Sequence, residues 1–294
     1  MNRNQRTLKD TLEFTGVGIH TGKSGRVRLC PGEVNSGIVF QGQKECIPAR
    51  VEYVVDTTRS TKLGRGEETI CTVEHLMAAL WGTGVDNAVV EFEGPEVPIL
   101  DGSAYPFVQG IQRLGLVEQG EPVRVASLQE PCFVARGDSI VLAMPAVATG
   151  FEGAVSYPCP EVGTQRFCFS ADDDFVSQLA PARTFGFWEE VKQLLAAGLG
   201  LGGDLSNALI YGRPAEVVPP DASVDELASQ TGLQTESGVR LRFANEAVRH
   251  KVLDLMGDIA LLGCTVQASF LAIRAGHSLH VELARKLAEV LVIR

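Results

Sequence analysis

NEAVRHKVLDLMGDIALL, residues 245–262, combines a stripe of aliphatic side chains with a cluster of titratable ones. Successive residues of an α-helix turn by about 100°, so Asp254 and Asp258 lie about 40° and 80° from His250. Lys251 lies about 100° from His250 on the same side, and the aliphatic residues lie on the opposite side. We therefore predict a helix with one apolar face and one face that carries an imidazole, two carboxylates and an ammonium group.

The polar face of this helix has two interpretations. His250 and Asp254 are four residues apart, so their side chains can reach one metal ion from successive turns. The alternative is a solvated face with chance pairs of charges, and an isolated His-x-x-x-Asp pattern favours that alternative. Further ligands and a base elsewhere in the chain would favour the metal site.

The composition is that of an ordinary globular protein. The chain has 294 residues, of which 45% are hydrophobic and 21% charged, and its formal net charge is −10. This negative charge argues against binding to nucleic acid or to anionic lipid. The start of the chain lacks an apolar core, and no uninterrupted apolar run reaches about 18 residues, so we expect neither a signal peptide nor a transmembrane helix. Seven cysteines without a Cys-x-x-Cys pair favour a reducing, cytoplasmic location.

Strands followed by helices occur twice along the chain. The first set comprises strands within 6–30, at 37–41 and at 87–92, a polar loop with a hairpin at 56–70, and helices at 72–80 and 104–114. The second set comprises strands at 122–128, 131–136, 139–144, 149–156, 207–211 and 265–274, helices at 172–180, 187–197, 245–262 and 278–292, and a polar loop with a short helix at 213–238. This order predicts an α+β protein of two similar domains, residues 1–119 and 120–294, each a β-sheet layered against helices.

Three polar residues are expected to cap helices. Thr72 and Asn245 immediately precede helical patterns, and Asp101 precedes the helix at 104–114. Glycines follow the ends of these patterns, as is typical of helix C-termini.

Glu74 and His75 are adjacent on the predicted helix at 72–80. As an isolated pair, they are typical of the charged edge of a core helix. In the functional interpretation, His75 is a third zinc ligand beside His250 and Asp254, and Glu74 is close to the water in the fourth position. Three protein ligands and one open position are typical of a catalytic zinc site.

His277 follows Gly276 at a turn from a strand to a helix. The helix N-terminus disfavours a charged imidazole, whereas a carboxylate such as Asp258 favours it. A surface histidine is one interpretation, and a general acid oriented by Asp258 is the other. His280, one turn later, is expected to be structural or exposed.

Eight short segments match one known family in order and with compatible spacing. They are QRTLK at 5–9, TGVGIHTG at 15–22, TVEHL at 72–76, PILDGSA at 98–104, ARTFGF at 182–187, GLGLGG at 198–203, VRHKVLD and GD within 248–258, and GH at 276–277. In these segments the chain resembles the zinc-dependent UDP-3-O-acyl-N-acetylglucosamine deacetylases of lipid A biosynthesis. The segments extend over nearly the whole chain.

The resemblance implies a role for each matching residue. It implies that His75, His250 and Asp254 bind one zinc ion, with ferrous iron as the alternative metal. It also implies that Glu74 is the general base and that His277, supported by Asp258, is the general acid. The catalytic and binding residues that it adds to this set are Thr184 for the oxyanion, Phe185 and Phe187 near the sugar, Lys251 near the diphosphate, His20 near the site, and Leu199 and Gly203 in a passage for the acyl chain.

The family further implies the reaction and its setting. The substrate would be a UDP-sugar lipid whose acetamide is hydrolysed between the two domains by a cytoplasmic monomer that does not insert into the membrane. Two rivals remain at this point: a sugar-nucleotide-binding homologue without turnover, and a zinc amidase that acts on another acylated amino sugar. The chain has a residue of the expected type at each catalytic position, which favours the deacetylase.

Overall fold

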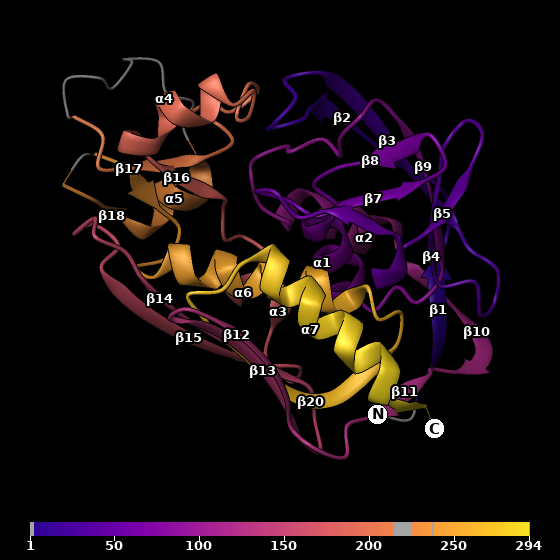
Figure 1. The fold of residues 1–294 in the computed structure, drawn as a ribbon. Helices are drawn as coiled ribbons and strands as arrows, with labels where there is room; N and C mark the ends of the chain where they lie inside the picture. The colour runs from indigo at the N-terminus through magenta and orange to yellow at the C-terminus, as the bar shows by residue number, and fades with distance from the viewer. Residues whose placement is uncertain (1–2, 215–224, 237, 294) are drawn as a thin grey trace.

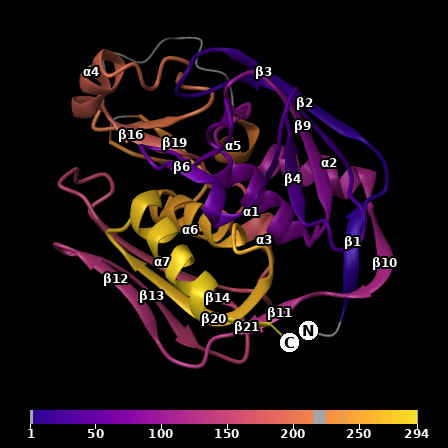
Figure 2. The same ribbon diagram turned by 45° about the vertical axis from the view of Figure 1, so that its right-hand side comes forward.

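Two β-sheets enclose a layer of helices in this protein, as a computed structural model of residues 3–214, 225–236 and 238–293 shows (Figures 1 and 2). One sheet comes from the first part of the chain and the other from the second part. The predicted α+β class is therefore confirmed. Within the residues that the structure describes, no helix has the length and apolar character needed to cross a membrane.

The first sheet has the order β2-β3-β9-β4-β5, and β4 runs parallel to β9. Along β3, Val27 and Leu29 are buried, whereas Arg26 and Arg28 point outward and pair with glutamates of β9, as the two-residue period of a strand requires. The elements of this part are β1 Asn4–Leu8, β2 Leu12–Val17, β3 Ser24–Pro31, β4 Ile38–Gln41, β5 Cys46–Pro48, a 3-10 turn Val51–Tyr53, β6 Val54–Asp56, β7 Lys62–Arg65, β8 Glu68–Ile70, α1 Glu74–Thr83, β9 Ala88–Glu93 and α2 Tyr105–Leu114.

The second sheet is built around β20, which is antiparallel to β13 and parallel to β14 and β11. The elements of this part are β10 Leu116–Pro122, β11 Val125–Ser127, β12 Cys132–Arg136, β13 Ser139–Pro145, β14 Gly150–Ser156, β15 Thr164–Ser170, α3 Phe175–Gln178, β16 Phe185–Phe187, α4 Trp188–Ala196, β17 Leu209–Tyr211, α5 Glu226–Thr231, β18 Leu233–Gln234, β19 Arg240–Leu241, α6 Glu246–Ala260, β20 Thr265–Ile273, α7 His277–Val290 and β21 Val292–Ile293. β10 pairs with β1, and the division at residues 119 and 120 stays a prediction.

Several strands of the second part were missing from the expected elements, among them β15 and β16. β15 alternates buried Phe167 and Phe169 with outward-facing residues, which is a strand pattern that the sequence contained. β16 has only three residues and no alternation, so its pairing with β17 became visible only in the fold. In the loop predicted at 213–238, residues 215–224 and residue 237 lie outside the described part of the chain.

Of the three predicted helix caps, Asn245 does occupy the N-cap position of α6, although its side chain makes no capping hydrogen bond. The caps predicted at Thr72 and Asp101 were wrong, because these residues are not at the N-cap positions and their side chains are engaged elsewhere. The Thr72 hydroxyl donates to Glu96, and α1 begins only at Glu74. Asn245 accepts a hydrogen bond from the Arg249 side chain. Asp101 accepts from the amide and hydroxyl of Ser103, before α2 begins at Tyr105. The αL glycine predicted after α1 is confirmed at Gly84.

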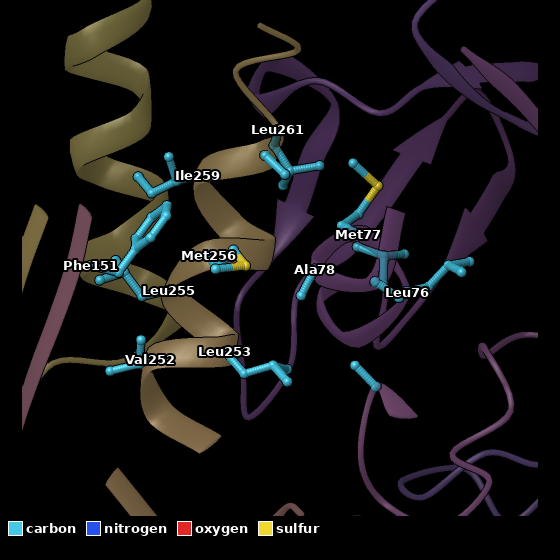
Figure 3. Packing of buried hydrophobic residues seen from close by; sticks show 14 of the residues in the cluster. Leu76, Met77, Ala78, Phe151, Val252, Leu253, Leu255, Met256, Ile259 and Leu261 are labelled. Atoms are coloured by element: carbon cyan, nitrogen blue, oxygen red, sulfur yellow. The ribbon is translucent and has the colours of Figure 1, made fainter. Parts of the chain in front are cut away.

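Helices α1 and α6 pack directly against each other at the centre of the molecule (Figure 3). Met77 and Ala78 of α1 face Leu253 and Met256 of α6, and all four side chains are buried. At Gly257 the helices approach so closely that a Cβ atom would lie 2.1 Å from the carbonyl oxygen of Glu74. This contact places the start of α1, with its Glu-His pair, against the polar side of α6.

We predict that Gly257→Ala destabilises the protein. An alanine in a helix interior normally stabilises by about 1 kcal/mol relative to glycine. Here the added methyl group would displace the backbone of α1, so we expect the free energy of unfolding to fall by about 1–3 kcal/mol. Urea unfolding followed by circular dichroism measures the change.

Gly150→Ala is the matched control for this variant. A Cβ atom at Gly150 would lie 3.7 Å from the nearest atom within 4 Å, an ordinary contact distance. Its free energy of unfolding should therefore stay near the wild-type value. If Gly257→Ala were as stable as wild type, the close approach of the helices would not be a constraint on the fold.

Candidate active site and metal centre

His250, Asp254 and Asp258, on the polar side of α6, are enclosed by the protein, whereas Lys251 is partly exposed. His250, Asp254 and Asp258 have relative exposures of only 1%, 2% and 0%. Helices α1 and α7 pack against α6 and cover these side chains. The alternative of a solvated helix face is therefore wrong, and the buried charges require specific partners.

His75, His250 and Asp254 converge on one point between α1 and α6. One ligand atom from each residue lies within 4.8 Å of those of the other two. The Nε2 atoms of His75 and His250 lie 3.6 and 3.4 Å from Asp254 Oδ1. Among the described residues this buried Oδ1 atom has no hydrogen-bond partner. An unpaired carboxylate oxygen between two imidazole nitrogens fits a bound cation, and the donor set suits zinc or ferrous iron.

Contacts around these ligands keep them in a metal-binding state. The Nδ1 atom of His250 lies 3.1 Å from the carbonyl oxygen of Ala182, so Nδ1–H donates there and Nε2 keeps its lone pair for a metal. Burial lowers the pKa of His250 to about 3, although Asp254 opposes this shift, and the imidazole is neutral. Lys251 Nζ lies 2.7 Å from Asp254 Oδ2 and compensates the second carboxylate oxygen.

Glu74 lies at the start of α1, beside His75, with its carboxylate buried. The backbone amide of Thr61 donates to Oε2 at 3.0 Å, and Oε1 lies 3.7 Å from His277 Nε2. Burial raises the pKa of Glu74, while His277 opposes this shift. A carboxylate with a raised pKa is better suited to take a proton near neutral pH.

His277 begins α7 and is held by Asp258. Its Nδ1 atom lies 2.8 Å from Asp258 Oδ2, and Thr61 Oγ1 donates to Oδ1 of the same carboxylate at 2.5 Å. Burial lowers the pKa of His277, but Asp258 and Glu74 outweigh it and raise the pKa to about 9. Of the two opposed influences expected from the sequence, the carboxylate is therefore dominant. The charged imidazole directs Nε2 towards Glu74.

His280 shares the Asp258 carboxylate with His277. Its Nδ1 atom lies 2.9 Å from Asp258 Oδ2, and its side chain is completely buried. Of the two expectations for His280, the structural one is confirmed and the exposed one is wrong.

An aromatic cluster borders the metal ligands. The ring of Phe185 lies 6.2 Å from that of His250, and Lys251 Nζ lies 5.5 Å from the centre of the Phe185 ring. Phe187 and Tyr157 continue the cluster, with ring centres 4.8 Å apart. The structure thus brings Lys251, Phe185 and Phe187 to one side of the metal ligands.

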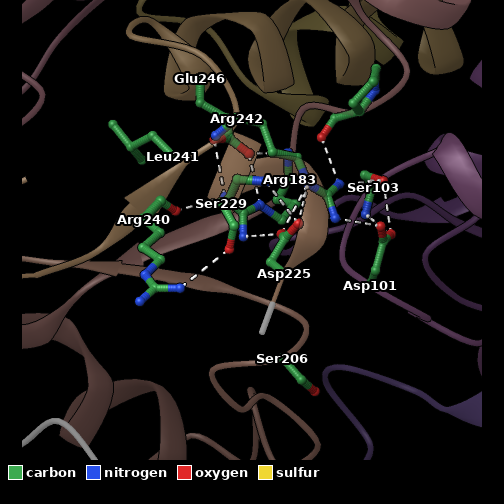
Figure 4. Close-up of polar contacts among 12 residues, drawn as sticks. Asp101, Ser103, Arg183, Ser206, Asp225, Ser229, Arg240, Leu241, Arg242 and Glu246 are labelled. Carbon is green, nitrogen blue, oxygen red and sulfur yellow. Dashed lines mark hydrogen bonds and ion pairs between the residues drawn. The ribbon is translucent and has the colours of Figure 1, made fainter. Parts of the chain in front are cut away.

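A buried network of ion pairs positions the segment that carries Thr184 and Phe185 (Figure 4). Arg183 pairs with Glu246 at the start of α6 and with Asp225 at the start of α5. Asp225 also pairs with Arg242, which reaches Asp101. Both arginines are buried, so their charges are compensated within the network. The network joins this segment to both parts of the chain.

Thr184 follows this network and is half-buried. Its amide donates to Gly102 at 2.8 Å, and its carbonyl accepts from Leu209 at 2.9 Å. These backbone bonds fix the segment beside α6. The assignment of the Thr184 hydroxyl to the oxyanion stays a prediction.

The turn that contains His20 contacts the glycine-rich segment at 198–203. The amides of Leu201 and Gly202 donate to the carbonyls of His20 and Ile19. Leu199, whose amide donates to the carbonyl of Leu194 in α4, and Gly203 therefore lie in a segment that is joined to this turn. Burial lowers the pKa of His20, and His277 contributes to the same shift, so the two imidazoles belong to one region.

Two residues of this region were missed in the sequence. Thr61 contacts both Glu74 and Asp258, yet it lies in a polar loop without any motif. Glu96 is buried and accepts four hydrogen bonds, from the amides of His20 and Thr21 and from the hydroxyls of Thr21 and Thr72. Thr72 has φ +57°, which is unfavourable for a β-branched residue. The Glu96 contact holds that strained residue just before Glu74.

Comparisons with known proteins show the family of this chain. A family model of UDP-3-O-acyl N-acetylglycosamine deacetylases, LpxC, matches residues 5–289. A protein of Nostoc sp. (strain PCC 7120) named UDP-3-O-acyl-N-acetylglucosamine deacetylase is 43% identical over 293 residues, 96% of this chain and 98% of that protein. Proteins of the same name from Thermosynechococcus vestitus and Chlamydia pneumoniae are 41% and 38% identical, over 97% and 99% of this chain and 94% and 99% of their own lengths. The chain belongs to the UDP-3-O-acyl N-acetylglycosamine deacetylase family.

Proposed function

We propose that this deacetylase holds one zinc ion with His75, His250 and Asp254 and hydrolyses the N-acetyl group of UDP-3-O-acyl-N-acetylglucosamine. The products are acetate and the UDP-3-O-acyl-glucosamine amine. The observation that carries the metal assignment is the buried Oδ1 atom of Asp254, which lacks a hydrogen-bond partner among the described residues and faces two imidazole nitrogens. Ferrous iron is the alternative metal for the same ligands.

When bound, zinc supplies Lewis acidity, which lowers the pKa of a water molecule in contact with it and polarises an amide carbonyl. Glu74 takes a proton from the attacking water, because its carboxylate is buried beside His75 and has a raised pKa. The amide of Thr61 holds Oε2, which leaves Oε1 for this proton.

His277 supplies a positive charge to the oxyanion and a proton to the leaving amine. Its protonated imidazole, oriented by Asp258, stabilises the developing oxyanion together with the hydroxyl of Thr184. His277 then donates its Nε2 proton to the amine, which leaves as the C–N bond breaks. Asp258 stays ionised throughout, because burial is outweighed by His277, which lowers its pKa.

The remaining residues bind the substrate in this proposal. Lys251 contacts the diphosphate, Phe185 and Phe187 border the sugar, and His20 lies near the same region. Leu199 and Gly203 border the passage for the acyl chain. We also propose that the chain forms two domains, 1–119 and 120–294, with the site between them. In this proposal the enzyme acts as a cytoplasmic monomer.

Asp254→Asn should abolish metal binding. The substitution keeps the shape of the side chain but removes the charge that faces the two imidazoles. We expect the metal content, measured by mass spectrometry after anaerobic purification, to fall from about one per chain to near zero. The same measurement on wild type distinguishes zinc from iron. Asp258→Asn, one turn later on α6, is the matched control and should keep its metal while losing turnover.

Glu74→Gln should keep its metal and lose activity. A glutamine oxygen can still accept from Thr61, so the fold is preserved, but the side chain no longer takes a proton. We expect kcat to fall by about 10²–10⁴-fold. A deacetylation assay on metal-loaded protein tests this, and a near-wild-type rate would exclude Glu74 as the base.

The dependence of kcat/KM on pH should be bell-shaped. The rate falls at low pH because a protonated Glu74 takes no proton, and it falls at high pH because a neutral His277 donates none. His277→Gln should lower the maximal rate and remove the alkaline limb while the acid limb remains. An alkaline limb that persists in this variant would exclude His277 as the acid.

A further inference from the structure

A cleft of about 250 Å³ lies at the far ends of the two helices that carry the metal ligands. Its lining comes from β1, from the C-terminal ends of α1 and α6, and from the segments that begin β11 and β20. His250 lies ten residues before the part of α6 that lines the cleft, which corresponds to about 15 Å along a helix. The cleft is therefore separate from the active site. Two of the parts of the chain that line it, β1 and the segment before β11, lie near the chain termini (Figure 2).

Four arginines line this cleft: Arg3, Arg6, Arg50 and Arg124. Asp86 is the single acidic side chain of the lining. The ends of α1 and α6 add about one negative charge together, since each helix C-terminus is equivalent to about half a charge. A positive excess remains, in a protein whose formal net charge is −10.

Two of the arginines have their charge compensated within the protein. Arg3 forms a double hydrogen bond with the Asp86 carboxylate. Arg50 donates to the carbonyl oxygen of Leu262 at 2.8 Å, which caps the end of α6. Arg3 and Arg50 therefore have structural roles.

Arg6 and Arg124 are not explained in this way. The Nε atom of Arg6 is buried and has no hydrogen-bond partner among the described residues. Burial and the neighbouring Arg3 lower the pKa of Arg6, and together they outweigh the opposite effects of Asp86 and Glu118, so the charge of Arg6 is only partly compensated. Arg124 is exposed and forms no salt bridge with any residue in the described ranges. A buried donor without a partner is costly, so an acceptor that reaches the cleft would stabilise it.

We propose that this arginine cleft binds a small phosphate-bearing anion, either inorganic phosphate or a small phosphate monoester. Guanidinium groups match phosphate oxygens in pairs, with Arg6 and Arg124 as the free donors. The volume suits a small ligand, and Met77 and Trp81 provide an apolar wall for the carbon part of an ester. The anion would join β1 and the segment before β11 at the ends of α1 and α6.

Ligand binding in the cleft can be followed through the fluorescence of Trp81 in the zinc-loaded full-length chain. The protein has two tryptophans, so Trp188→Phe leaves Trp81 as the single reporter. Inorganic phosphate and glycerol phosphate are titrated separately at constant ionic strength, with chloride as the balancing anion. We expect a saturable change in Trp81 fluorescence and a rise in Tm with ligand concentration. A lower Kd for glycerol phosphate would identify an ester as the preferred source, and equal values would identify the phosphate group itself.

Arg124→Gln tests the assignment without disturbing the core, because Arg124 is exposed. Its Kd should rise by at least about tenfold. Arg113→Gln is the matched control, since Arg113 is an exposed arginine of α2 outside the cleft, and its Kd should not change. The proposal is wrong if neither anion gives a saturable signal, or if both variants weaken binding equally. It is also wrong if Lys251→Ala abolishes the signal while Arg124→Gln leaves it intact, because the anion would then occupy the active site.

Discussion

The close approach of α6 to the start of α1 is the constraint on which the rest of the structure depends. Gly257 lets the backbone of α6 lie against the Glu74 carbonyl, and the apolar faces of both helices pack around this contact. The two helices begin at Glu74 and Glu246, 172 residues apart in the chain. Their contact brings His75 into range of Asp254, so the metal site and the packing of the core are consequences of the same interface.

The charges of these buried ionisable groups must be compensated by nearby partners. The same partners also determine whether each group is protonated. Lys251 compensates Oδ2 of Asp254, whose Oδ1 faces the two imidazole rings, and His277 and Thr61 compensate Asp258. Burial alone would raise the pKa values of these carboxylates, but their partners keep them low. Glu74 lacks such strong partners, and its pKa is raised. In the proposed mechanism, these different environments suit three buried carboxylates to the roles of metal ligand, orienting group and base.

A second set of contacts holds the loops that border the candidate active site. Glu96 joins the turn at His20 to the residue before α1, and the network around Arg183 joins the aromatic segment to α6. These ion pairs and hydrogen bonds connect segments that are far apart in the chain, so they fix the positions of the loops. Asp101 has its role in this network, which explains why it does not cap the helix that follows it.

The sequence by itself determined the α+β class, most strands and helices, and the residues of the candidate site, because hydrophobic periodicity and short motifs are local properties. It could not determine Thr61, Glu96 or the strand β16, whose roles depend on partners far away in the chain and on no motif of their own. It also misplaced the helix caps at Thr72 and Asp101, because their side chains have other partners, Glu96 for Thr72 and Ser103 and Arg242 for Asp101. Which groups are buried together, and hence which are charged, was decided only by the tertiary structure, since pKa values depend on burial and neighbours.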